Sequence, residues 1–378
     1  MENEIDGTAA AIGQPLVGER HVDIPDECLR VKADFFEEPS KAVIREIREF
    51  VATTGESHMW RGHTHNSPAS DARVKYLEYI ELPEKFARKK LWLVCPVCHP
   101  SSRWFGKEPG VIAWFPDEGV IRLIGPDCFS KLNKESHDEA LDELVKRKKR
   151  ERDSSFLLGL RDQHLSTLAA LKATSQVALA LDQFGVALRK VLVEKQNIDI
   201  WRHVKSGALE VIERFREAVS NRNNPTNVSF SESERLRPYS RLRGYGILNP
   251  AYAKLAPKFA APAKTLEEIA AIGDWPSFVD GLSDAERDGL VRRLTKATKA
   301  AKSLREQVVE LRSFLTVLNI STLRTWGSLS NSPVAIWARQ EGNVLLIGRT
   351  ESVKMRVTIP PEMDTEIAEI VEAIPDAA

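Results

Sequence analysis

The sequence has few cysteines and no long apolar run. Only 4 of its 378 residues are cysteine, which argues against a disulfide framework and for a reducing compartment, so we expect a cytoplasmic protein. No stretch of about eighteen consecutive apolar residues occurs, and the N-terminus lacks a basic region followed by an apolar one. Neither a membrane span nor a signal peptide is therefore predicted.

An excess of charge of one sign is also missing. The 54 Lys and Arg residues balance 54 Asp and Glu residues, which removes the simplest argument for a nucleic-acid-binding protein, so any such role must depend on local patches. The sequence contains no phosphate loop, dinucleotide fingerprint, HExxH or Gly-x-Ser-x-Gly motif. These absences favour a binding protein over an enzyme.

The most informative feature that is present is a group of three cysteines. Cys95 and Cys98 stand in LVCPVCHP, and Cys128 follows thirty residues later in LIGPDCFSK. Two cysteines separated by two residues can bind one tetrahedral ion, and a thiolate from a distant turn adds a third ligand. Ordinary buried cysteines are the alternative, but the Cys-Pro-x-Cys spacing favours Zn²⁺ as a bound cofactor.

A tetrahedral zinc site needs a fourth ligand. We predict His137, nine residues after Cys128, provided that residues 129–136 form a loop and a helix begins near Ser136. His99 and Cys28 are the alternatives. Three cysteines alone would leave a coordination position open for water, as in catalytic sites, and would restore a metal-dependent hydrolase or nuclease as a possibility.

The segment between the cysteines, VIAWFPDEGVIRLIG, predicts a hairpin with its turn at residues 116–119, and a helical pattern follows the last cysteine. This order resembles the treble-clef class of zinc modules over about residues 91–145. The motifs CPVC and IGPDC followed by Lys131 are similar to zinc-knuckle modules in uncharacterised phage-associated bacterial proteins, which implies a bacterial or phage protein. His99 stands where such modules usually have glycine, and Leu132 stands where they have a ligand.

A histidine-rich segment precedes the cysteines. HMWRGHTHN carries His58, His63 and His65. A His-x-His pair can share one metal ion, but the carboxylates that a metallohydrolase site would supply are not nearby. We expect a polar surface loop, with a second metal site as the alternative.

Two seams of apolar residues predict long coiled-coil helices, which we expect to pair as antiparallel arms or to cause self-association between chains. The later seam begins with a capping box of Ser283 and Glu286, and the earlier one lies in a helical stretch from about 138 to 196. The earlier seam is extended with a phase shift by Leu157, Leu160, Leu168 and Leu171. The seam residues are Val177, Leu181, Phe184, Leu188 and Val191, and then Leu290, Leu294, Ala297, Ala301, Leu304, Val308, Leu311, Leu315 and Leu318.

Two basic segments are candidate nucleic-acid interfaces. The first is Lys146, Arg147, Lys148, Lys149 and Arg150, which cover every face of a helix and are therefore expected to stand in solvent. The second is the set Arg235, Arg237, Arg241 and Arg243, which has tyrosines among it and suits phosphates and stacked bases. An acidic protein surface, simple solvation or a flexible connection are the alternatives.

The sequence thus predicts an α+β protein that is mostly helical. Its parts are a disordered tail (1–17), a zinc-binding α/β module (18–137), a long helix and a following helix (138–222), a Pro/Gly/Arg-rich connection (223–282), a coiled-coil helix (283–320) and a three-stranded sheet with one helix (321–378). We expect a non-enzymatic, zinc-stabilised binding protein associated with nucleic acid. The alternative is a structural or adaptor protein whose zinc module binds a protein partner.

Overall fold

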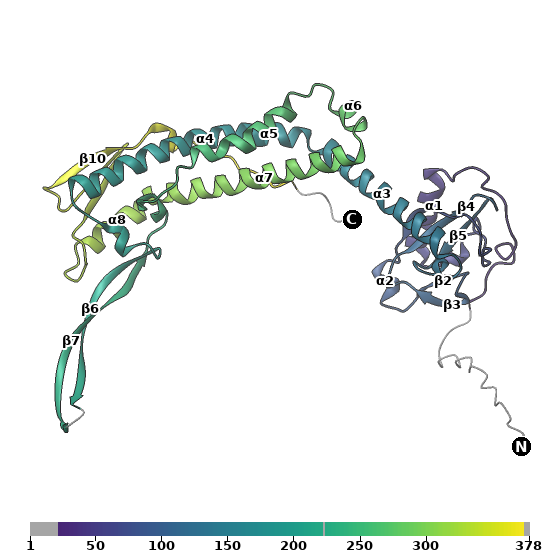
Figure 1. Cartoon of the computed structure of the whole chain (residues 1–378), viewed down its shortest axis with the longest axis horizontal. Helices are drawn as coiled ribbons and strands as arrows, with labels where there is room; N and C mark the ends of the chain where they lie inside the picture. The colour runs from purple at the N-terminus through teal and green to yellow at the C-terminus, as the bar shows by residue number, and fades with distance from the viewer. Residues whose placement is uncertain (1–21, 222–223, 374–378) are drawn as a thin grey trace, which may run out of the picture. The chain divides into compact units, whose positions relative to one another are not determined.

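A computed structural model describes residues 22–221 and 224–373 (Figure 1). Helices and small antiparallel sheets make up the chain, which confirms the α+β class. The chain divides into two compact units, Met1–Glu151 and Arg152–Ala378, each with its own apolar core. The predicted disordered tail, residues 1–17, lies outside the described residues.

Unit 1 is built on a three-stranded antiparallel sheet in the order β1–β4–β5. The strands are β1 (Lys75–Ile80), β4 (Gly110–Phe115) and β5 (Val120–Ile124). β4 and β5 form the predicted hairpin, in which Gly119 has a φ of 66°. This left-handed conformation is easily reached by glycine and closes the turn. The sequence therefore identified the hairpin between the cysteines correctly.

The other elements of unit 1 pack around this sheet. β2 (Leu93–Cys95) and β3 (His99–Phe105) form a second antiparallel pair. α1 (Lys41–Thr54) contributes apolar side chains to the core, and α2 (Glu84–Ala87) and the 3₁₀ turns η1 (Ser57–Met59) and η2 (Phe129–Lys131) are short. The first half of α3 (Lys134–Gly159) completes the core. The segments that bear the three cysteines thus belong to one packed unit.

The long helix predicted over about residues 138–196 is interrupted once. α3 ends at Gly159, and α4 (Arg161–Arg189) begins after Leu160 and continues into a π-helical segment, Lys190–Lys195. The interruption falls where the apolar seam changes phase, because inserted residues rotate the apolar stripe away from the partner surface unless the helix adjusts.

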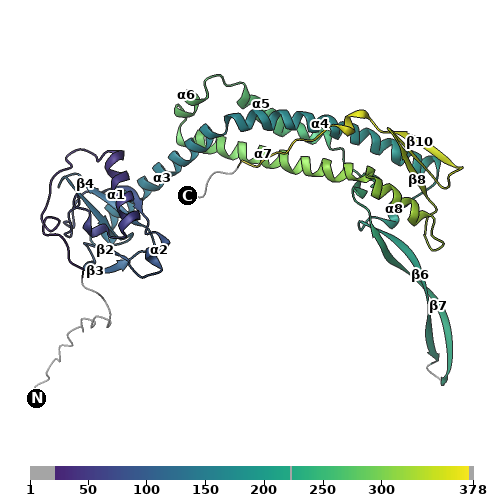
Figure 2. The same ribbon diagram turned by 180° about the vertical axis from the view of Figure 1, so that it is seen from behind.

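The prediction of a helix over residues 206–222 was wrong. β6 (Ala208–Asn221) and β7 (Asn224–Arg241) form a long two-stranded hairpin that projects from the helical part of unit 2 (Figures 1 and 2). Opposite charges face each other across it: Arg214 pairs with Glu234 at 2.8 Å, and Glu213 with Arg235 at 2.6 Å. Glu210 and Arg214, four residues apart, would also suit a helix, so the charge pattern alone did not separate the two structures.

The second strand of this hairpin forms the first part of the predicted connection over residues 223–282. The chain then returns along α4 through the 3₁₀ turns η5 (Tyr245–Leu248) and η6 (Ala256–Phe259) and through α5 (Ala260–Ala270) and α6 (Trp275–Asp280). Lys172 of α4 pairs with Glu267 of α5 at 2.7 Å, and Arg161 donates to the carbonyl of Gly273 at 2.9 Å. α5 is therefore antiparallel to α4.

The direction of the second long helix corrects another expectation. α7 (Asp284–Arg312) starts with the predicted capping box of Ser283 and Glu286. Arg293 of α7 pairs with Glu268 of α5 at 2.5 Å, while Glu310 accepts from the backbone N–H of Gly244. α7 is thus antiparallel to α5 and parallel to α4, because α5 has already brought the chain back. The two long helices are not antiparallel arms.

The seam residues of both long helices are largely buried inside one chain. Those of α4 and those of α7 up to Val308 share one apolar core, and α4 contacts both α5 and α7, as Figures 1 and 2 show from opposite sides. α7 ends at Arg312, and after η7 (Ser313–Leu315) the chain starts a separate helix, α8 (Val317–Gly327). Self-association through these seams stays a prediction, and it would have to compete with this packing within the chain.

The C-terminal sheet agrees with the sequence, but the helix after it does not. β8 (Trp337–Glu341), β9 (Val344–Gly348) and β10 (Lys354–Thr358) form the predicted meander, which packs on α8 and α4. After the turn η8 (Pro361–Asp364), residues 365–373 are not helical. Arg305 donates to the carbonyl of Ala368 at 2.8 Å and Arg312 to that of Thr365 at 2.7 Å. These carbonyls are occupied by α7 and are not available to close helical turns.

Candidate metal centre

The first two cysteines of the cluster lie where β2 turns into β3. Cys95 is the last residue of β2, and it pairs in the antiparallel register with His99, the first residue of β3. His99 is not among the described residues with a positive φ. Since His99 is extended, glycine is not required at this position, which explains how the module accommodates histidine there.

The third cysteine follows β5 in a tight turn. The backbone N–H of Cys128 donates to the carbonyl of Gly125 at 3.3 Å, and the N–H of Gly125 lies 3.4 Å from Cys95 Sγ. Cys98 Sγ and Cys128 Sγ are 3.1 Å apart, and all three sulfur atoms lie within 4.8 Å of one another. Zinc–sulfur bonds of about 2.3 Å in a tetrahedron separate sulfur atoms by roughly 3.8 Å. The three cysteines are therefore close enough to bind one metal ion.

The charge state of the cluster also suits a cation. Hydrogen bonds with Cys128 and Cys98 lower the pKa of Cys95, while hydrogen bonds with Cys95 and Cys98 raise the pKa of Cys128. The lowered pKa of Cys95 favours its thiolate form. A divalent cation would displace the remaining protons, because thiolates and not thiols are metal ligands.

Gly125 is expected to control the affinity of the cluster for metal. A Cβ atom at this position would lie 2.7 Å from Cys128 Sγ, so Gly125→Ala should displace the sulfur and reduce the affinity about 10- to 100-fold, as changes beside a ligand do. The measurement is a competition titration with a chromophoric chelator. Asp127→Asn is the control, because Asp127 is exposed in the same turn. Equal affinities for wild type and Gly125→Ala would contradict the geometry of the cluster.

The three candidates for a fourth ligand lie in different surroundings. The hydroxyl of Tyr76 is 2.7 Å from His137 Nδ1, and α3 begins at Lys134, where Asn133 accepts from the N–H of Ser136 at 3.0 Å. His99 stacks on Trp104 with ring centroids 4.1 Å apart. Cys28 is buried beside the Trp60 carbonyl. Within the described ranges, the group of ligand atoms around Cys95, Cys98 and Cys128 includes none of these three, so His137 as the fourth ligand stays a prediction.

The first basic segment is only partly exposed to solvent. Arg147 donates to the carbonyls of Tyr76 and Leu77 at 2.6 and 2.8 Å, and Lys148 pairs with Glu78. These two side chains are half-buried, so the expectation that all five cations stand in solvent was wrong. Long basic side chains can pack along an apolar surface and still reach a carbonyl or carboxylate at its edge. Lys146, Lys149 and Arg150 are exposed.

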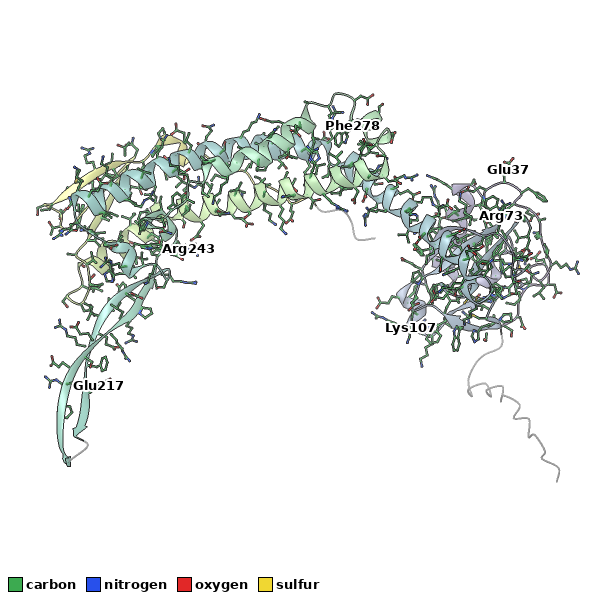
Figure 3. All side chains as sticks on the ribbon, viewed as in Figure 1. Glu37, Arg73, Lys107, Glu217, Arg243 and Phe278 are labelled. Atoms are coloured by element: carbon green, nitrogen blue, oxygen red, sulfur yellow. The ribbon has the colours of Figure 1, made fainter. Side chains whose placement is uncertain are left out.

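The arginines of the second segment are divided by the hairpin. Arg235 and Arg237 both pair with Glu213, at 2.6 and 3.3 Å. Arg241 and Arg243 are exposed, and neither guanidinium group has an ion-pair partner among the described residues. Figure 3 marks Arg243 where the hairpin meets the helical part of unit 2. Cross-strand neutralisation thus leaves two of the four predicted arginines with free charge.

Arg241 and Arg243 line a groove of about 860 Å³ at the base of the hairpin. Glu310, the acidic residue of its wall, uses its carboxylate to accept from the N–H of Gly244 at 3.0 Å. We name this site the hairpin groove. Its hydroxyl-bearing residues come from elements far apart in the sequence, and no sequence pattern could have grouped them. They are Ser206, Ser240, Tyr245, Thr316 and Thr322.

The comparisons with known proteins supply no relative. No family model matches the chain, and no curated protein and no solved structure is similar to it. Within the described ranges, no helix combines the length and the apolarity that a membrane span requires. The geometry of the sites therefore carries the functional conclusion.

Proposed function

We propose that this chain is a zinc-stabilised binding protein without enzymatic activity, in which Cys95, Cys98 and Cys128 bind one structural Zn²⁺. The observation that supports zinc is the convergence of three sulfur atoms from two separate turns on the core of unit 1. Sulfur-rich tetrahedral sites of this kind select zinc and stabilise small folds. In our proposal His137 completes the site by exchanging its contact with Tyr76 for the metal, and zinc loss in His137→Ala would support that choice.

We further propose that nucleic acid is the partner and that the hairpin groove of unit 2 is where its phosphates bind. The support is the combination of two unneutralised guanidinium groups, Arg241 and Arg243, with several hydroxyl groups in one concave site. Arginine and hydroxyl side chains are the usual donors to phosphate oxygens. A balanced net charge does not oppose such binding, because phosphate contacts depend on local charge.

Salt dependence provides the test of the hairpin groove. The logarithm of the association constant should fall linearly with the logarithm of salt concentration, and Arg241→Ala/Arg243→Ala should make that slope shallower by about 2, since about one counterion is released per phosphate contact. Fluorescence anisotropy of a labelled generic duplex and a labelled single strand measures both quantities.

A matched control is available within the same hairpin. Arg235→Ala/Arg237→Ala removes the same total charge, but these arginines are already paired with Glu213, so the slope should stay close to that of wild type. If both double variants lost the same affinity and the same salt slope, net charge and not the groove would determine binding. Absence of salt-dependent binding to either probe would remove nucleic acid as the partner.

One observation favours a protein partner as the second candidate. Val317 and Leu318, at the start of α8, are 83% and 74% exposed, and Leu318 also lines the hairpin groove. Exposed apolar side chains beside a polar groove are typical of protein-binding surfaces. Salt-insensitive capture of a protein that is lost in Leu318→Ser would support an adaptor role instead.

A further inference from the structure

Three buried histidines lie close together in the sequence of unit 1, outside the cysteine cluster. They are His58 in η1 and His63 and His65 in the segment that follows it, and each is at most 3% exposed. The expectation of a polar surface loop was therefore wrong. The N–H of Thr64 donates to the carbonyl of Ile121 in β5 at 2.8 Å, which holds this segment against the sheet.

The partners of two of these rings fix their tautomers. His63 Nδ1 contacts the carbonyl of Trp60, and His65 Nε2 lies 2.9 Å from the carbonyl of Pro100. A carbonyl oxygen only accepts, so each of these ring nitrogens must carry the proton. A neutral imidazole has one N–H, which leaves His63 Nε2 and His65 Nδ1 as bare acceptors.

These two bare nitrogens face each other at a distance of 3.1 Å. Two lone pairs in contact inside a protein repel each other unless a cation lies between them. Zinc–nitrogen bonds of about 2.0–2.1 Å in a tetrahedron would separate two ligand nitrogens by roughly 3.3 Å. The observed separation is close to that value.

We propose that His63 Nε2 and His65 Nδ1 bind a second divalent transition-metal ion, of the zinc class, in unit 1. Metal-binding histidines commonly donate their other ring N–H to a backbone carbonyl, which is the arrangement that Trp60 and Pro100 provide. Among the described residues no third His, Cys, Asp or Glu joins the pair within 4.8 Å. The pair should therefore bind metal more weakly than the cysteine cluster and fill after it.

The test is a metal titration of the full chain followed by elemental analysis. Wild type at saturating Zn²⁺ should hold one ion more than His63→Gln and one more than His65→Gln. His58→Gln is the matched control, since His58 is a buried histidine of the same segment whose Nδ1 has no hydrogen-bond partner, and it should retain both ions. The second ion should persist in Cys128→Ser, which separates this site from the cysteine cluster.

A spectroscopic measurement on wild type avoids any effect of the substitutions on folding. Co²⁺ added to protein that holds one zinc ion, in the cysteine cluster, should produce ligand-field absorption without a sulfur-to-cobalt charge-transfer band, because the pair supplies nitrogen only. Binding of a single ion by wild type at saturation would overturn the proposal, as would a second ion that both histidine variants keep. A charge-transfer band on the added Co²⁺ would also overturn it.

Discussion

Removal of the metal from the cysteine cluster is expected to unfold unit 1 and to leave unit 2 folded. A structural zinc site contributes an apparent free energy of about 10–16 kcal/mol, which equals or exceeds the whole stability of a typical domain, about 5–15 kcal/mol. The cluster joins the β2–β3 turn to the turn after β5, so its loss separates two segments of one core. Unit 2 has a separate apolar core, so removal of the metal should not destabilise it.

Hydrogen exchange measures both halves of this prediction in one experiment. After chelation, or in Cys128→Ser, peptides from β2, β4 and β5 should lose protection, while peptides from α4 and α7 should keep it. Cys28→Ser is the control, because it makes the same chemical change at a buried cysteine outside the cluster. Full protection of unit 1 in the chelated protein would mean that the cluster does not stabilise the fold.

Replacement of Asp182 by alanine is expected to destabilise unit 2 by about 3 kcal/mol or more. This buried carboxylate on α4 accepts from the hydroxyl of Tyr252 at 2.8 Å and from the backbone N–H groups of Leu255 and Ala256 at 3.0 and 2.9 Å. Each buried donor left without an acceptor costs about 1–3 kcal/mol. The same contacts position the start of η6, where the chain returns along α4.

Urea denaturation followed by circular dichroism measures this effect as a shift in the transition of unit 2. Glu306→Ala is the control, since Glu306 is an exposed acid on α7 and its removal should change the stability by less than about 0.5 kcal/mol. A shift in Asp182→Ala no larger than in this control would show that the three donors find other partners or water.

The two hairpins, β4–β5 and β6–β7, differ in how well the sequence predicts them. In unit 1 the turn at residues 116–119 was predicted correctly, because a proline, two acids and a glycine between apolar runs permit few other conformations. In β6, Glu210 and Arg214 have a spacing that suits a helix, although the segment is a strand. In the folded hairpin Glu213 pairs across the strands with Arg235, and the sequence does not indicate this contact.

Long-range contacts also decided the features that the sequence could not predict. Ile367 and Ile370 suit a helix, but Arg305 and Arg312 on α7 bind the backbone carbonyls of that segment and hold it extended. The direction of α7 follows from α5, whose role the sequence did not indicate. The cysteine cluster was predictable because the spacing of Cys95 and Cys98 is a local sequence signal. The hairpin groove was not predictable, because the residues that line it are far apart in the sequence and come together only when the chain folds.

Zinc content per chain is the most direct measurement of the central proposal. Elemental analysis of wild type and Cys128→Ser, purified without chelators, should differ by one zinc ion per chain, and Cys95→Ser should match Cys128→Ser. Equal zinc content in wild type and both cysteine variants would contradict zinc binding by this cluster, and with it the proposal of a zinc-stabilised unit 1.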